Sequence, residues 1–184
     1  MNNVKRLNNY KNIIYDFDGT LFKFKLDWTQ WHDKVKAMIK KYEPSFEKEG
    51  LVNNIQNDYV KKYGKALKDK ISSMNETYEI ENIKKVTPNK KLIEYIRNRK
   101  NVINFVLTSN NHKLVDGFLK EYGIYERFEK IIARDDVFLI KPDSEGIEKI
   151  LKGLDRKVTI MVGDTSNDEL TARTSAIDFE MVKI

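Results

Sequence analysis

The chain has 184 residues, 40% of them hydrophobic and 34% charged, with three prolines, no cysteine and a formal net charge of +6. This composition is typical of a folded domain and argues against disorder, and the length suits one domain with an insertion. The absence of cysteine excludes disulfides, thiolate metal sites and cysteine nucleophiles. We expect a cytoplasmic location, because the chain has neither an apolar run long enough for a membrane helix nor an apolar N-terminal signal core.

The excess of basic residues raises the question of a nucleic-acid partner, since phosphate backbones are bound mainly by Lys and Arg. The lysines are scattered in pairs, mostly where a helix would face solvent, at 40–41, 61–62, 84–85 and 90–91. We therefore do not expect the chain to bind nucleic acid, and a basic surface suits small anionic substrates equally well.

Apolar runs of strand length follow one another along the chain. Four are continuous, at residues 12–16, 102–108, 130–134 and 158–164, and a weaker fifth lies at 176–184. Continuous rather than alternating apolar character is typical of strands covered on both faces. The sequence therefore predicts a parallel sheet.

Helical patterns lie between these runs. The first is predicted to begin with Thr87 as N-cap and Pro88 at the first helical position, and two others to end at Gly123 and Gly153. Their apolar faces comprise Leu92, Ile93, Ile96, Leu114, Val115, Phe118, Leu119, Ile147, Ile150 and Leu151. Alternation of strand and helix predicts an α/β fold with right-handed crossovers.

Residues 22–86 interrupt this alternation with helical patterns alone. The segment is longer than a connecting loop needs to be, so we expect a helical insertion between two core segments, 1–21 and 87–184. Trp28 and Trp31 stand at helical spacing within it. We interpret them as part of the core of the insertion rather than as ligand-stacking residues.

Polar side chains follow the predicted strands at their carboxyl ends, where ligands bind in open parallel sheets. Lys141 lies in the loop before the third helix, and the others are Asp16, Asp18, Thr108, Ser109, Asp164 and Asp168. Such a convergence is hard to obtain from random surface polarity. It predicts a binding site at this edge of the sheet.

The stretch "DFDGT" at residues 16–20 contains two acids in alternate positions. An extended backbone directs Asp16 and Asp18 to one side and Phe17 to the other. Gly19 allows a sharp turn whose N–H groups can face an anion, and Thr20 adds a hydroxyl. Because adjacent carboxylates repel each other without a cation or a shared proton, Mg²⁺ is the expected cofactor.

The segments "DFDGTLF", "VLTSN", "KPDSEG" and "VGDTSNDELTA" occur in the order of the four motifs of the haloacid dehalogenase superfamily, and with their strands they span nearly the whole chain. The chain resembles in particular the phosphoglycolate-phosphatase-like members with a helical cap. The resemblance implies a Rossmann-like three-layer α/β/α core with strand order 5-4-1-2-3 and places the cap at 22–86. One departure is "FKFKLDW" after the first motif, where many capped members have an acidic residue followed by serine.

The resemblance also implies a role for each motif residue. Asp16 matches the nucleophile that forms an aspartyl-phosphate, and Asp18 the acid and base of the two half-reactions. Thr108 matches the hydroxyl that binds phosphoryl oxygens, and Lys141 the lysine that offsets their charge. Asp164 matches the Mg²⁺ ligand that acts with Asp16 and the backbone carbonyl of Asp18.

Four further residues have more than one interpretation. Asp168 resembles a residue that orients a metal ligand or Lys141, although an acid that stabilises a helix N-terminus is an alternative. Ser109 and Asn110 could contact phosphate or cap the next helix. His32 and His112 have no partner at metal-ligand spacing, so we expect ordinary histidines.

The sequence therefore predicts a magnesium-dependent phosphatase acting on a small phosphorylated metabolite. Asp18 favours phosphoester chemistry, because dehalogenases and phosphonate-cleaving members of the superfamily lack it. A sugar-phosphate mutase is the first alternative, since it differs only in the group that accepts the phosphoryl. A non-catalytic anion- or nucleic-acid-binding module is the second, and the clustered acids argue against it.

Overall fold

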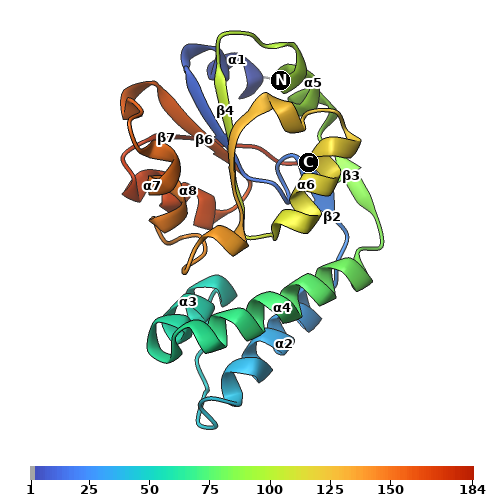
Figure 1. The fold of residues 1–184 in the computed structure, drawn as a ribbon, viewed down its shortest axis with the longest axis vertical. Helices are drawn as coiled ribbons and strands as arrows, with labels where there is room; N and C mark the ends of the chain where they lie inside the picture. Colours follow the sequence, from blue (N-terminus) through green and yellow to red (C-terminus); the bar gives the residue numbers. More distant parts are fainter. Residues whose placement is uncertain (1–2) are drawn as a thin grey trace.

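The computed structural model describes residues 3–184. The first two residues, which the expected core segment 1–21 includes, lie outside the described residues. Figure 1 shows a sheet flanked by helices, with three further helices forming a separate layer beyond one end of the sheet. Among residues 3–184, none of the helices has the length and apolar character needed to cross a membrane.

Five parallel strands form the central sheet. They are β1 (Asn12–Tyr15), β4 (Ile103–Leu107), β5 (Phe128–Ile132), β6 (Thr159–Gly163) and β7 (Asp178–Met181). Their spatial order is β5-β4-β1-β6-β7, with every neighbouring pair parallel. Counted from the β7 edge with core strands numbered along the chain, this is the expected order 5-4-1-2-3. The prediction of a Rossmann-like α/β core is confirmed.

Helices cover both faces of the sheet. On one face, α5 (Lys90–Asn98) and α6 (His112–Glu121) bury apolar side chains against β1, β4 and β6. On the other, α7 (Glu145–Leu151) and α8 (Ser166–Thr174) pack against the opposite sides of the same strands. Burial on both sides explains why β1 and β6 are entirely buried and read as continuous apolar runs.

The helices α2 (Trp28–Lys40), α3 (Val52–Tyr63) and α4 (Lys65–Asn82) form what we call the three-helix unit. Asp27 caps α2 by accepting a hydrogen bond from the backbone N–H of Gln30. The unit has its own apolar core, formed by Trp31, Val35, Ile39, Phe46, Val52, Ile55, Val60, Leu67, Ile71 and Tyr78. Apart from Phe46, which lies between α2 and α3, its members recur at helical spacing, as predicted.

A short antiparallel ribbon joins the unit to the core. It consists of β2 (Phe22–Phe24) and β3 (Val86–Pro88), with Phe24 opposite Val86 and Phe22 opposite Pro88. The prediction that Thr87 and Pro88 begin a helix is therefore wrong. Both residues are extended, and Asn89 is the residue that caps α5, by accepting from the N–H of Leu92.

The remaining elements are short: α1 (Asn3–Arg6), η1 (Leu7–Asn9), η2 (Tyr125–Arg127), η3 (Arg134–Asp136) and η4 (Arg156–Val158). The strand predicted at 130–134 begins and ends two residues earlier. Glu129 and Lys130 are exposed on this edge strand, which obscured its start, and Arg134 already belongs to η3. The predicted helix ends at Gly123 and Gly153 are confirmed, since each glycine has positive φ and follows the C-cap residue of a helix.

Candidate functional site

Asp16 follows the last residue of β1, at the carboxyl end of the central strand. Its backbone N–H donates to the carbonyl of Val162 in β6 at 2.8 Å, which extends the sheet by one residue. Asp16 is only 5% exposed, and the hydroxyl of Thr20 donates to its Oδ2 at 3.3 Å. The strand thus delivers a buried carboxylate to a fixed place.

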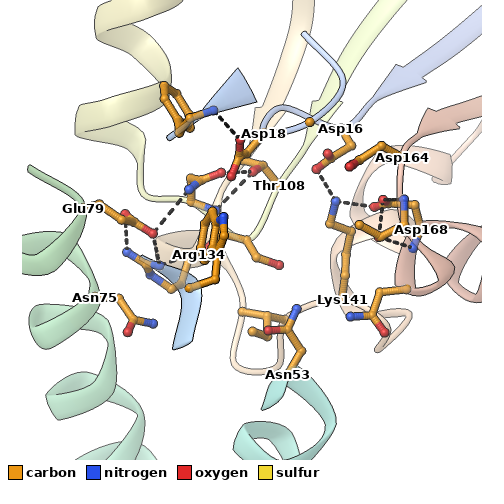
Figure 2. A pocket seen from close by; sticks show the side chains of 18 of the residues that line it. Asp16, Asp18, Asn53, Asn75, Glu79, Thr108, Arg134, Lys141, Asp164 and Asp168 are labelled. Carbon is orange, nitrogen blue, oxygen red and sulfur yellow. Dashed lines mark hydrogen bonds and ion pairs between the residues drawn. The ribbon is translucent and has the colours of Figure 1, made fainter. Parts of the chain in front are cut away.

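Lys141 meets this carboxylate from the loop between η3 and α7. Its Nζ donates to Oδ1 of Asp16 and, at 2.6 Å, to Oδ1 of Asp168 (Figure 2). Burial disfavours the charged amine, but the two carboxylates outweigh it and raise the pKa of Lys141. The lysine is therefore a permanent cation beside Asp16.

Asp168 fills both of the roles that the sequence left open, helix capping and contact with Lys141. Its Oδ2 accepts from the backbone N–H of Thr165 at 3.1 Å while the hydroxyl of Thr165 accepts from the N–H of Asp168, which is a capping box at the start of α8. Its other oxygen binds Lys141. The same acid thus begins the helix and orients the lysine.

One carboxylate oxygen each of Asp16, Asp164 and Asp168 lies within 4.8 Å of the others, as a divalent cation requires. Both oxygens of Asp16 and both oxygens of Asp168 already accept hydrogen bonds, whereas Oδ1 of Asp164 is buried without a partner. An unpaired buried acceptor is costly, and carboxylate oxygens suit a hard cation such as Mg²⁺. The donor set therefore fits a divalent ion, and Asp164 contributes its one unpaired carboxylate oxygen.

Gly19 makes room for Asp164. Its φ is +89°, and a Cβ at this position would lie 2.1 Å from Oδ2 of Asp164. A side chain here would be strained and would also displace the carboxylate. The glycine predicted to allow a sharp turn is also needed for this close approach.

Asp18 lies nearby with its carboxylate held differently. Its Oδ1 accepts from the backbone N–H of Phe24 in β2 at 3.0 Å. Burial raises the pKa of Asp18 to about 7, and the charges of Asp164 and Glu79 add to this. Burial also raises the pKa of Asp16, against the opposing effect of Lys141. Burial thus shifts the pKa of both acids upward, and Lys141 opposes the shift at Asp16.

Thr108 follows β4 and is buried beside the acids. Its hydroxyl donates to Oδ1 of Asn110 at 3.0 Å and accepts from the N–H of the same residue at 3.1 Å. The alternative that Ser109 or Asn110 caps the next helix is wrong, because Asn111 is the N-cap of α6. The hydroxyl of Ser109 is buried without a partner.

These side chains face a cavity of about 320 Å³ that is also lined by the three-helix unit. Trp28 and Trp31 both line it, and the prediction that they belong to the core of the insertion is confirmed for Trp31 and wrong for Trp28. Trp31 is buried in the core of the unit, but Trp28 is 40% exposed. Figure 2 shows Asn75, from α4, and Asn53, from α3, on the side of the cavity away from Asp164.

A sequence profile of the haloacid dehalogenase-like hydrolases matches residues 13–182. The chain belongs to this family. The match includes β1 through β7 and every residue that the motifs indicated, so the family assignment rests on the core and the three-helix unit together.

Individual relatives support the same assignment. The pyrophosphatase PpaX of Halalkalibacterium halodurans is 41% identical over 66 residues, which are 35% of this chain and 31% of that protein. The chain thus aligns with about a third of this curated relative. Two crystal structures show the fold at low identity. A haloacid dehalogenase-like hydrolase from Bacteroides fragilis has a TM-score of 0.60 at 16% identity, covering 92% of this chain and 86% of that one. A predicted phosphoglycolate phosphatase from Haemophilus somnus has 0.57 at 21%, covering 93% and 84%.

This family member also has polar contacts near the site that the sequence did not predict. Arg134, 2% exposed, forms a two-point ion pair with Glu79 of α4 at 3.0 and 3.1 Å. Asn57 of α3 binds the backbone of Ile140 through both ends of its amide, at 2.6 and 3.0 Å. Arg134, Glu79 and Asn57 are isolated polar residues that belong to no motif. The one signal in the sequence is that Asn57 and Glu79 occupy positions on the buried faces of their helices.

Proposed function

We propose that the chain is a magnesium-dependent phosphatase that hydrolyses a small phosphomonoester through an aspartyl-phosphate on Asp16. One observation carries the proposal: the Asp16 carboxylate, the Lys141 ammonium and the unpaired Oδ1 of Asp164 come together at one cavity. Family membership supports hydrolysis, and the names of several similar proteins support a phosphate substrate.

Asp16 is the proposed nucleophile. Its backbone hydrogen bond to β6 and its ion pair with Lys141 hold it in place, so the carboxylate is preorganised for attack on phosphorus. Its attack forms the P–O bond to the carboxylate while the P–O bond to the substrate alcohol breaks. Lys141 and the hydroxyl of Thr108 would stabilise the phosphoryl oxygens.

Asp18 is the proposed acid and base. The protonated form donates to the departing alkoxide, and the resulting carboxylate takes a proton from the water that attacks the aspartyl-phosphate. This second step releases inorganic phosphate and restores Asp16. The hydrogen bond from Phe24 to Oδ1 orients the group and leaves its other oxygen available for the proton.

Mg²⁺ would be held by Asp16, Asp164 and the backbone carbonyl of Asp18, and when bound it supplies positive charge to the phosphoryl oxygens. Asp168 keeps Lys141 in place and is not needed as a ligand. The three-helix unit, within the proposed cap segment 22–86, would exclude bulk water from the cavity, with 1–21 and 87–184 as the catalytic core.

The experiment is release of inorganic phosphate and p-nitrophenol from p-nitrophenyl phosphate, with Mg²⁺ and with EDTA. We expect turnover only with Mg²⁺, and none in Asp16→Asn, whose melting temperature should show that it folds. Asp33→Asn, at an exposed acid of α2, is the matched control and should retain wild-type turnover. Wild-type activity in Asp16→Asn, or full activity in EDTA, would contradict the proposal.

A further inference from the structure

Resting on the proposed phosphatase function, we infer that the alcohol part of the substrate is a small neutral polyol of about the size of one sugar, recognised by Asn75 and Trp28. The inference excludes phosphorylated carboxylic acids and pyrophosphate as preferred substrates. It depends on an unpaired amide, an exposed indole and the charges around the cavity.

Asn75 provides the recognition of an oxygen atom. Its side chain is 1% exposed, and its Oδ1 accepts from the indole N–H of Trp31 at 2.9 Å. Since an indole nitrogen can only donate, this bond fixes which end of the amide is oxygen. The Nδ2 group is left buried without a partner, and Figure 2 shows the amide facing the cavity opposite Asp16 and Lys141. A hydroxyl oxygen of the substrate would satisfy it.

Trp28 provides an apolar surface in the lining of the same cavity. Its ring lies perpendicular to that of Trp31, with centroids 5.6 Å apart, and it is one of the large apolar side chains that stay exposed. An indole at the edge of a cavity offers a flat face to the C–H groups of a ligand, while the neighbouring amide binds its oxygens. This pairing of an aromatic face with an amide suits a sugar or a similar polyol.

The charges around the cavity oppose a second anionic group on the substrate. Three basic side chains line it, and Arg134 and Lys141 are already paired with Glu79, Asp16 and Asp168. The third, Lys23, donates to the backbone carbonyl of Ile184 and acts electrostatically on Asp164. Five acids share the same lining. A carboxylate or second phosphate on the alcohol would lose its hydration beside this excess of acids, and Lys23 is the one basic side chain of the lining without an acidic side-chain partner among the described residues.

The size of the cavity limits the alcohol further. Its volume of about 320 Å³ lies at the lower end of the roughly 300–1,000 Å³ typical of small-molecule sites. Since the phosphoryl group must occupy the part next to Asp16 and Lys141, the rest accommodates a single small ring or a short polyol.

Matched substrates test the charge argument. Glycerol 3-phosphate and 3-phosphoglycerate differ only in a hydroxymethyl group against a carboxylate, and sorbitol 6-phosphate and 6-phosphogluconate form a second pair with the same difference. We expect kcat/KM to be about tenfold or more higher for the neutral member of each pair, and higher than for pyrophosphate. Equal or higher values for the acids would overturn the inference. p-Nitrophenyl phosphate is the reference substrate. If the enzyme hydrolyses it but prefers the acidic member of each pair, only this inference is refuted. If it hydrolyses no phosphate ester, the proposed function is refuted.

Asn75→Asp tests the amide directly. It keeps the oxygen that binds Trp31 but replaces the free N–H donor with an acceptor. We expect kcat/KM for the preferred neutral ester to fall about tenfold to a hundredfold, mainly through KM, and by clearly less for p-nitrophenyl phosphate. Asn54→Ala, at an exposed position of α3, is the control and should leave both values unchanged. An equal fall for both substrates would assign Asn75 a structural role alone and overturn the inference.

Discussion

Single atoms decide the geometry around Asp164, and Gly19 shows this most directly. Gly19→Ala would place a methyl group 2.1 Å from Oδ2 of Asp164 at a φ of +89°. We expect loss of phosphatase activity and weaker protection by Mg²⁺ in thermal unfolding, because the carboxylate must move. Gly117→Ala is the matched control. Gly117 lies exposed in the interior of α6 with no atom in the way, so alanine should stabilise the fold by about 0.5–1 kcal/mol. Equal activities in the two variants would contradict this account of Gly19.

His112, an ordinary histidine by sequence, has two acidic partners in the structure. Its ring nitrogens lie 3.2 Å from Oδ1 of Asp116 and 2.7 Å from Oδ2 of Asp136. Partial burial lowers the pKa of His112, but the two carboxylates outweigh it and the net change is upward. Since the folded-state pKa lies above the unfolded value of about 6.5, the protonated ring stabilises the fold fully below that pH. The contribution is lost as pH rises through the folded-state pKa.

The corresponding prediction is that His112→Gln lowers the melting temperature more at pH 6 than at pH 8.5. His32→Gln should show the opposite trend, because burial and Lys36 lower the pKa of His32 and the folded state therefore disfavours its proton at low pH. Melting curves at the two pH values measure both. A pH-independent difference for His112→Gln would contradict the role of the ion pairs.

The helix α3 is connected to the proposed active site through Asn57. Its amide donates to the carbonyl of Ile140 and accepts from the N–H of the same residue, directly before Lys141. We expect Asn57→Ala to lower kcat about tenfold with little change in KM, because the loop that positions Lys141 loses both bonds. Lys61→Ala is the control one turn further along α3. Its exposed ion pair with Asp143 reaches the same loop at 3.6 Å, and its loss should leave kcat unchanged. A fall in melting temperature without a fall in kcat would make Asn57 structural only.

Elements with a strong pattern were predictable from the sequence, and the ribbon was not. The strand β1 and the helix α6 could be recognised because burial imposes a continuous run on one and a repeating apolar face on the other. The strands β2 and β3 have three residues each, too few to show a period. Thr87 and Pro88 resemble a helix start locally, but their pairing with β2 decides their conformation, and Pro is tolerated in such an edge strand.

The residues of the site also divide into those that the sequence could predict and those that it could not. Asp16, Lys141 and Asp164 stand at strand ends or in a recognisable motif, so their convergence follows from the topology. Asn75 and Arg134 become significant only through side chains that arrive from other segments, Trp31 and Glu79. No spacing in the sequence encodes such contacts.

At the scale of the whole molecule, the ion pair of Glu79 with Arg134 joins the three-helix unit to the core. Glu79 is 4% exposed, and it also accepts from Nδ2 of Asn110 at 3.3 Å. Glu79→Ala leaves a buried guanidinium without its partner and should cost about 3–5 kcal/mol of the free energy of unfolding, measured by urea denaturation. The double variant Glu79→Leu with Arg134→Met should recover most of it, because neither charge remains.

The exposed pair of Glu148 and Arg156 serves as the control for this prediction. Both side chains are at least 40% exposed, so Glu148→Ala should change stability very little. Similar losses for Glu79→Ala and Glu148→Ala would show that the buried pair has no special importance.

Because Phe24 stands opposite Val86, the chain leaves the sheet domain and returns to it at the same spot. The segment between those two positions begins and ends at paired strands. Its length and composition can therefore vary while the distance between its two ends stays that of neighbouring strands. Substrate preference can therefore diverge through that segment during evolution without disturbing the alignment of the parallel strands. Replacing the segment by a short turn between β2 and β3 would leave that alignment intact.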